Sequence, residues 1–165
     1  MAGINLYVLL QSDSGLHLMG KRRVIIMDTK NILVVDEDAD IRQSLITFLN
    51  ERNYNAVAAA SCGEAIELLH KDTYQLLITE MQLPDGDAYH LIDLLAEYYP
   101  YTVTIVMSRF VSTEAAIKAV KRGACGYLAK PLFLDELSFN IEKALVYQSI
   151  TAEDLSEKYG INCSF

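Results

Sequence analysis

A regular alternation of two hydrophobic patterns, which begins at Asn31, constrains the fold of this chain more than any other feature. Runs of adjacent aliphatic residues, such as NILVVD, are typical of strands that are covered on both faces. The segment that follows carries Ile41, Leu45 and Phe48 at helical spacing, which predicts an amphipathic helix. The two patterns occur together five times, with strands expected at residues 31–36, 55–60, 75–80, 102–108 and 126–130. We therefore predict an α/β fold, a doubly wound parallel sheet with helices on both faces.

Local signals at the ends of the helical segments support this order of elements. Ser61 and Glu64 stand in capping-box register before the second helix. Pro100 is expected to end the third helix, and Gly123 to end the fourth. The hydrophobic periodicity and the turn chemistry therefore agree on where each unit stops.

The composition of the 165 residues limits the classes of function. Hydrophobic residues make up 52% and charged residues 22%, which predicts a packed domain rather than a disordered chain. The net charge of -8 argues against a direct nucleic-acid partner, which would need a basic patch. No apolar run reaches the ~18–20 residues of a membrane span, and no signal peptide is recognised. Three cysteines without a C-x-x-C pair are expected to be reduced thiols, so we expect a cytoplasmic protein.

Polar side chains gather at the carboxyl ends of four predicted strands. They are Asp36, Glu37 and Asp38 after the first strand, Glu80 on the third, Ser108 on the fourth and Lys130 on the fifth. In parallel sheets, chemistry lies beyond the carboxyl ends of the strands, so we expect these residues to converge. Carboxylates suit a hard cation such as Mg²⁺, and a lysine with a hydroxyl suits a phosphoryl group.

Four stretches carry a resemblance to a known family; in chain order they are ILVVDED, LLITEMQLPDGD, TIVMS and GYLAKPL. Together they resemble a response-regulator receiver domain over residues 31 to about 148. The resemblance implies a flavodoxin-like sheet with strand order 2-1-3-4-5. It also implies two-component phosphorelay signalling, in which a histidine kinase transfers a phosphoryl group to an aspartate.

The resemblance assigns roles to the residues at the strand ends. Asp36 and Glu37 match the acidic pair that binds Mg²⁺, and the backbone carbonyl of Gln82 would complete the metal site. Ser108 and Lys130 match the hydroxyl and the ammonium group that contact the phosphoryl group. The chain thus retains the residue types of a receiver at these positions.

Three further positions complete the comparison with the family. Tyr127 matches an aromatic residue that turns inward on activation, and Pro131 matches a proline commonly joined by a cis peptide bond. Glu80 stands where the phosphoaccepting aspartate is expected. The carboxylate is in the right place on the strand, but it is on the wrong side chain.

The extra methylene of Glu80 has two consequences. It moves the carboxylate outward by ~1.5 Å, and a misplacement of that order can slow in-line attack about 100-fold. It also moves the negative charge toward the position of a phosphoryl group, where Ser108 and Lys130 could meet it. We hypothesise a phosphomimetic-like, constitutive module. An inert docking module and a weakly phosphorylatable receiver of a truncated transcriptional regulator are the alternatives. We expect no enzyme, because Glu80 and Gln82 do not supply the two acids of a haloacid dehalogenase-type hydrolase.

A second departure from the family follows the switch hydroxyl. Arg109 and Phe110 stand where a small residue is usual. The Arg109 guanidinium could cover the pocket and pair with Glu80; a solvated arginine on a loop is the alternative. Because Glu80 can also fold onto Lys130, we expect Mg²⁺ binding to be weak or absent.

Protein partners, a histidine kinase or a downstream effector, are expected from the resemblance. We also expect a homodimer through the fourth helix, fifth strand and fifth helix. The charged residues of that face are Lys118, Lys121, Arg122, Asp135 and Glu136.

The two ends of the chain lie outside the family pattern. Residues 1–30 contain two apolar runs, which leaves a hairpin, partial disorder or an upstream start codon as alternatives. Residues 149–165 are expected to form a tail with a short helix, because Thr151 and Asp154 stand in cap register before Gly160. The tail is too short for a DNA-binding output domain, so the chain is either a stand-alone receiver or a fragment of a longer regulator.

Overall fold

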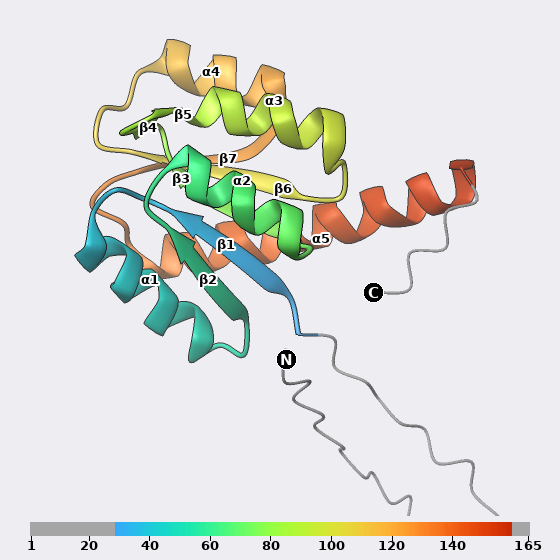
Figure 1. Ribbon diagram of the computed structural model, residues 1–165, viewed down its shortest axis with the longest axis horizontal. Coiled ribbons are helices and arrows are strands. Elements are labelled where there is room, and N and C mark those ends of the chain that lie inside the picture. Colours follow the sequence, from blue (N-terminus) through green and yellow to red (C-terminus); the bar gives the residue numbers. More distant parts are fainter. Residues whose placement is uncertain (1–28, 160–165) are drawn as a thin grey trace, which may run out of the picture. The chain divides into compact units, whose positions relative to one another are not determined.

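The central element of the fold is a parallel sheet of five strands in the order β2-β1-β3-β6-β7 (Figure 1). The computed structural model describes residues 29–159, with side chains described over 29–150. In chain order this is the arrangement 2-1-3-4-5, so the predicted flavodoxin-like topology is confirmed. The strands are β1 (Asn31–Val35), β2 (Asn55–Ala59), β3 (Leu76–Glu80), β6 (Val103–Ser108) and β7 (Ala124–Ala129).

Five helices connect and cover these strands. They are α1 (Ala39–Asn50), α2 (Cys62–Lys71), α3 (Ala88–Tyr98), α4 (Thr113–Arg122) and α5 (Leu134–Tyr159). Two short strands, β4 (Gln82–Leu83) and β5 (Gly86–Asp87), pair antiparallel between β3 and α3. This small hairpin lies directly after Glu80, so it belongs to the edge of the sheet where the predicted site is expected.

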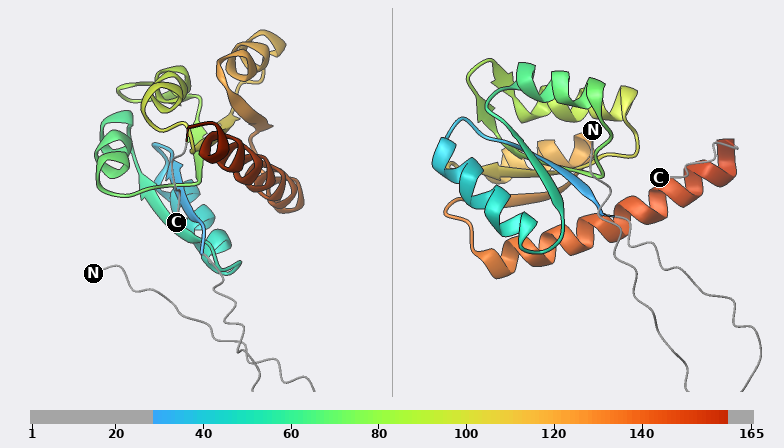
Figure 2. Two further views of the ribbon diagram at one scale, coloured as in Figure 1. Left: turned by 90° about the vertical axis from the view of Figure 1, so that its right-hand side faces the viewer. Right: turned by 60° about the horizontal axis from the view of Figure 1, so that its bottom comes forward.

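The alternation of side chains along each strand divides the core into two layers. On β1, Ile32 and Val34 pack with α1 and α5, whereas Leu33 and Val35 pack with α2 and α3. A third cluster joins α3 and α4 to β6 and β7. Figures 1 and 2 show the resulting three layers, with α1 and α5 on one face of the sheet and α2, α3 and α4 on the other. Successive residues of a strand point to opposite faces, which explains why these strands are apolar throughout.

The predicted helix signals act as expected, with one change of partner. The Ser61 hydroxyl accepts a hydrogen bond from the Glu64 N–H at 3.2 Å, as in a capping box. The Glu64 carboxylate, however, accepts from the N–H of Ala60 at 2.7 Å rather than from that of the cap residue. Ser112 caps α4, and Gly123 ends it with a φ of 118°, a left-handed conformation that favours glycine.

The C-terminal helix differs from the prediction. We expected a helix that ends near Gln148 and a separate short helix from Thr151, but α5 continues without a break from Leu134 to Tyr159. No glycine or proline lies between these positions to interrupt the helical hydrogen bonds. The expectations for residues 1–28 and for Gly160 lie outside the described residues. Within the described part of the chain, no helix has the length and apolarity needed to cross a membrane.

Candidate functional site

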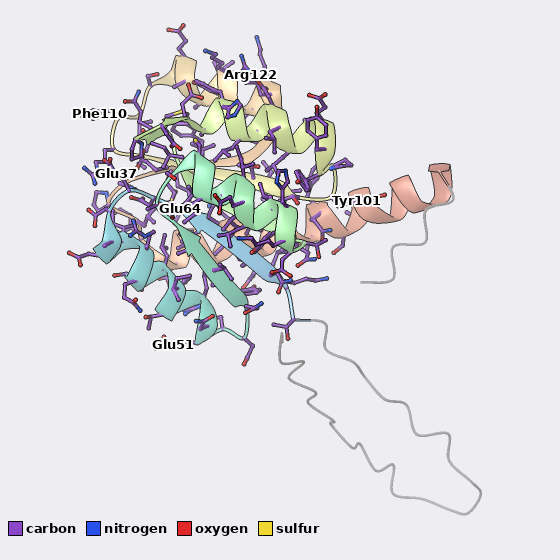
Figure 3. All side chains as sticks on the ribbon, in the orientation of Figure 1. Glu37, Glu51, Glu64, Tyr101, Phe110 and Arg122 are labelled. Atoms are coloured by element: carbon purple, nitrogen blue, oxygen red, sulfur yellow. The ribbon has the colours of Figure 1, made fainter. Side chains whose placement is uncertain are left out.

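The predicted polar residues converge at the carboxyl edge of the sheet. Glu80 and Ser108 are the last residues of β3 and β6, and Asp36 and Lys130 directly follow β1 and β7. Asp36 is fully buried, and Glu80 and Ser108 are 7% and 3% exposed. Figure 3 shows the labelled residues Glu37 and Phe110 at this end of the domain, away from Tyr101 at the other end of β6. The edge therefore places charged and polar groups in a nearly closed site.

Lys130 is the centre of a buried cluster of charges. Its ammonium group donates a hydrogen bond to Asp36 Oδ2 and forms an ion pair with Glu80 Oε2. The Lys130 side chain is only 6% exposed. One cation thus faces two carboxylates within the protein, and we call this cluster the charge triad. The predicted contact between Glu80 and Lys130 is present.

Backbone N–H groups complete the coordination of the two carboxylates. Asp36 Oδ1 accepts a hydrogen bond from the N–H of Asp38 at 2.9 Å, and Glu80 Oε1 accepts one from the N–H of Met81 at 2.9 Å. Glu80 Oε2 receives no well-directed hydrogen bond, so only the charge of Lys130 balances it. Such additional hydrogen bonds are what make burial of an ion pair tolerable, because desolvation of the charges is costly.

Ser108 does not meet Glu80 as expected. Its hydroxyl donates to the carbonyl oxygen of Phe110 at 2.9 Å and accepts from the N–H of Phe110 at 3.1 Å. The hydroxyl is thus occupied by its own loop, and the Phe110 side chain on that loop is 85% exposed. The contact predicted between Glu80 and Ser108 is therefore not formed.

Arg109 has a different partner from the one we expected. Its guanidinium lies 3.3 Å from Asp38 Oδ2, and Glu80 is instead paired with Lys130. Asp38 is the accessible carboxylate, whereas Glu80 is buried and already neutralised, so the pair with Asp38 requires less desolvation. Because β3 lies between β1 and β6, this ion pair joins the two loops that flank the end of β3.

Tyr127 lies on the inward side of β7. Its ring packs against the cluster formed by α3, α4 and β6, and its hydroxyl is buried without a hydrogen-bond partner. Tyr89 packs against the same cluster, and burial raises the pKa of the Tyr89 hydroxyl. The peptide bond between Lys130 and Pro131 is cis, as the resemblance implied.

The residues expected to hold Mg²⁺ differ in exposure and in what they contact. Glu37 and Gln82 are exposed, whereas Asp36 is buried and directed at Lys130. Within residues 29–150, no three Asp, Glu, His or Cys side chains lie close enough together to hold a metal ion. The Lys130 ammonium group lies beside the carboxylates of Asp36 and Glu80.

Two residues that support the site were not predicted. Arg42 donates to the carbonyl oxygens of Asp36 and Glu37, at 2.6 and 2.9 Å, and so holds the acidic loop in place. An arginine in the first turn of a helix after an acidic run is the signal that could have indicated it.

Asp85 is the second of these residues. Its carboxylate accepts from the N–H groups of Cys62 and Gly63, each at 2.8 Å, and these hydrogen bonds lower the pKa of Asp85. A Cβ at Gly86 would lie 3.0 Å from Cys62 Sγ, so the turn that carries Asp85 approaches the start of α2 closely. Burial raises the pKa of the Cys62 thiol to about 11, which keeps it protonated near neutral pH. The hairpin after Glu80 is thereby attached to α2.

Comparison with known proteins identifies the class of this fold and site. The family model of the response regulator receiver domain matches residues 32–142. The chain therefore belongs to the response regulator receiver domain family.

Relatives with a curated name are longer proteins. The chain is 32% identical to the response regulator protein PilR of Pseudomonas aeruginosa over 128 residues, which is 78% of this chain and 29% of that protein. It is 32% identical to the transcriptional regulatory protein ZraR of Escherichia coli K12 over 127 residues, 76% of this chain and 29% of that protein. The chain thus spans less than a third of the length of these relatives.

Solved structures agree with the family assignment. A CheY-like receiver domain protein from Methanospirillum hungatei superimposes with a TM-score of 0.70 at 26% identity, over 74% of this chain and 98% of that one. The beryllofluoride-activated NtrC4 receiver domain dimer superimposes with a TM-score of 0.70 at 31% identity, over 73% of this chain and 99% of that one.

Proposed function

We propose that this chain is an atypical receiver domain of two-component signalling whose interactions do not depend on phosphorylation. The observation that carries the proposal is the charge triad, in which Lys130 contacts both Asp36 and Glu80. Glu80 takes the place of the phosphoacceptor, and the cation that would otherwise meet a phosphoryl group already neutralises it. Protein partners, a kinase or an effector, then recognise a state that the chain adopts by itself.

The geometry of Glu80 supports slow or absent phosphotransfer. One carboxylate oxygen is held by the N–H of Met81 and the other by Lys130, so neither is free to attack a phosphodonor. In-line attack requires reacting atoms within ~3–3.5 Å and aligned. Breaking two buried interactions first adds to the cost of the extra methylene. Weak or absent Mg²⁺ binding follows from the same arrangement, because the ion would have to displace Lys130.

Tyr127 and Ser108 together support a module with one constant conformation more than a complete imitation of the phosphorylated state. Tyr127 is turned inward, as the resemblance implies for an active domain. Ser108 is bonded to Phe110 and is disengaged from Glu80. We therefore propose a constitutive interaction module without catalytic residues, acting in the cytoplasm.

The experiment that tests this proposal is intact-mass measurement after incubation with acetyl phosphate and Mg²⁺. Wild type and Glu80→Asp are compared, with Glu80→Gln as the control that has no carboxylate. We expect only Glu80→Asp to gain one phosphoryl group. A gain by wild type would overturn the proposal. If neither wild type nor Glu80→Asp gains mass, the double variant Glu80→Asp, Arg109→Ala tests whether the ion pair between Arg109 and Asp38 blocks the site. If the double variant also gains no mass, the phosphomimetic-like module is overturned in favour of an inert docking module.

A second candidate is a weakly phosphorylatable receiver of a transcriptional regulator. It is favoured by relatives whose names are regulatory proteins and whose length this chain spans only in part. Wild type that gains phosphate slowly in the same measurement would support it. Glu80→Gln must then remain unmodified, because the acceptor has been removed.

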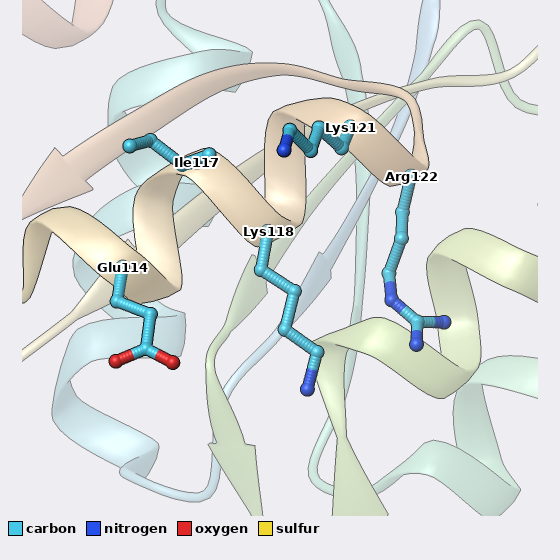
Figure 4. A pocket seen from close by; sticks show the side chains of 5 residues that line it. All are labelled: Glu114, Ile117, Lys118, Lys121 and Arg122. Carbon is cyan, nitrogen blue, oxygen red and sulfur yellow. The ribbon is translucent and has the colours of Figure 1, made fainter.

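Self-association is the remaining part of the proposed function. We propose a homodimer through α4, β7 and α5, supported by the likeness to a receiver that is a dimer. On α4, Lys118, Lys121 and Arg122 line a shallow hollow together with Glu114 and Ile117 (Figure 4). Sedimentation velocity of unphosphorylated protein tests this proposal, and a monomer at high micromolar concentration contradicts it.

A further inference from the structure

Helix α4 is held to the domain by little apolar burial. Of its ten residues only Ala119 is buried. Helix α1, by comparison, buries two leucines and Phe48. The free energy of apolar burial scales with the buried area, so the methyl group of one alanine contributes much less than these larger side chains. The position of α4 therefore depends strongly on its other contacts.

Two residues of α3 supply such contacts. The Tyr89 hydroxyl donates a hydrogen bond to the carbonyl oxygen of Ala115 at 3.3 Å. The Lys118 ammonium lies 4.3 Å from the centre of the Tyr89 ring, and the Arg122 guanidinium carbon lies 5.3 Å from it. Arg122 also forms an ion pair with Asp93. We call Tyr89, Asp93, Lys118 and Arg122 the α3–α4 clamp.

The clamp residues lie on one side of each helix. Tyr89 and Asp93 are four residues apart, and so are Lys118 and Arg122, which places each pair on a single face. Figure 4 shows Lys118 and Arg122 extending from the same side of α4, whereas Lys121 lies on another side. Each cation–π contact or exposed ion pair is weak by itself. Acting together over successive turns, they fix the orientation of α4 against α3.

Tyr127 lies close to the clamp. Tyr89 and Tyr127 pack against one apolar cluster, and that cluster includes Ala119 of α4. Burial is the main cause that raises the pKa of the Tyr89 hydroxyl, and the neighbouring Tyr127 hydroxyl is the next. The two tyrosines are therefore neighbours between α3, α4 and the sheet.

No hydrogen bond among the described residues holds Tyr127 in its buried position. Its hydroxyl is buried and has no partner, which by itself opposes this position. The Ser108 hydroxyl is bonded to Phe110. In the described part of the chain, the hydrogen bonds and ion pairs of the charge triad involve no residue of α3 or α4. The packing of α4 and Tyr89 around the ring must therefore outweigh the cost of the unpaired hydroxyl.

We propose that the α3–α4 clamp keeps α4 in place and thereby keeps the Tyr127 ring buried, independently of the group at position 80. Tyr89 is its central positioning residue, because three of the four contacts between the helices use its ring or its hydroxyl. This inference rests on the proposed function, a module of constant conformation, and names the contacts that keep the conformation constant.

Hydrogen–deuterium exchange of the α4 backbone amides, read by mass spectrometry, tests the first step. We expect Tyr89→Leu to accelerate this exchange about tenfold or more, because one hydrogen bond and two cation–π contacts are lost together. Tyr98→Leu replaces a 66% exposed tyrosine of the same helix and is the matched control. It should leave α4 unchanged. Equal exchange in the two variants overturns the clamp.

A second pair of variants decides the question if a circular dichroism melt shows that Tyr89→Leu disturbs folding. Lys118→Gln removes a cation from the Tyr89 ring, whereas Lys121→Gln removes a neighbouring exposed charge. We expect exchange in α4 to rise about two- to fivefold in Lys118→Gln only. The same rate in both variants contradicts the proposal.

Nitration of Tyr127 by tetranitromethane, located by peptide mapping, tests the second step. We expect Tyr127 to react faster in Tyr89→Leu and to stay protected in wild type and in Glu80→Gln. Continued protection in Tyr89→Leu overturns the hold on Tyr127. If Glu80→Gln exposes Tyr127 and loosens α4 as much as Tyr89→Leu does, the charge triad controls α4, and the clamp fails while the proposed function stands. Phosphate gain by wild type has the opposite meaning: the proposed function fails, and the clamp, measured on unphosphorylated protein, is judged by its own variants.

Discussion

Replacement of Lys130 by methionine is the most informative perturbation of the charge triad. The side chain keeps a similar length and loses its charge, so Asp36 and Glu80 face each other without a cation. Asp36 is fully buried and Glu80 is 7% exposed, so water cannot take over the role of the ammonium group. Removal of one partner from a buried ion pair costs about 3–5 kcal/mol. We expect a loss of that size in the free energy of unfolding.

The assays are urea unfolding and thermal unfolding, each followed by circular dichroism, with the double variant Lys130→Met, Glu80→Gln as the matched control. A domain of this size loses roughly 3–4 °C in Tm per kcal/mol, so Lys130→Met should melt about 10–20 °C lower. The second substitution removes one unpaired charge and should recover part of that loss. Mg²⁺ should stabilise Lys130→Met more than wild type, because the ion can then occupy the place of the ammonium group. A loss below about 1 kcal/mol, the value of an exposed pair, would refute the reasoning.

Three other substitutions test features around the triad. Tyr127→Phe should stabilise the domain by about 1 kcal/mol in urea unfolding, because it removes a buried hydroxyl without a partner; a loss of stability would indicate a hydrogen bond in solution. The lowered pKa of Asp85 means that its contribution to stability is present above the unfolded pKa, near 4, and is lost as the pH falls through the lower folded value. Asp85→Asn should therefore flatten the acid limb of a Tm-against-pH curve, and an unchanged limb would contradict this role. Gly123→Ala should cost about 1 kcal/mol, since φ is 118° there, whereas a comparison of Lys121→Ala with Lys121→Gly, at an exposed position within α4, serves as a control for helix propensity alone.

The predicted site residues illustrate how far sequence reasoning extends. The convergence of Asp36, Glu80 and Lys130 follows from parallel strands, whose carboxyl ends share one edge of the sheet. The contact between Glu80 and Lys130 was predicted from the sequence, but the pair of Arg109 with Asp38 and the bond of Ser108 to Phe110 were not. Lys130 is 94 residues from Asp36 in the chain, and Arg109 is 71 residues from Asp38. The choice among several nearby carboxylates depends on burial and on which atoms backbone N–H groups already occupy.

The sequence alone determined the order of the elements, most helix ends and the edge of the sheet that carries the site. Those properties depend on the period of apolar residues and on local turn chemistry, which act over a few residues. The tertiary structure decided that Ser108 bonds to Phe110, that Arg109 pairs with Asp38 and that Lys130 also contacts Asp36. It also decided that Tyr89 of α3 meets Lys118 and Arg122 of α4. Each of these outcomes is a competition between groups from distant segments, and its energies are set by burial and distance only once the chain has folded.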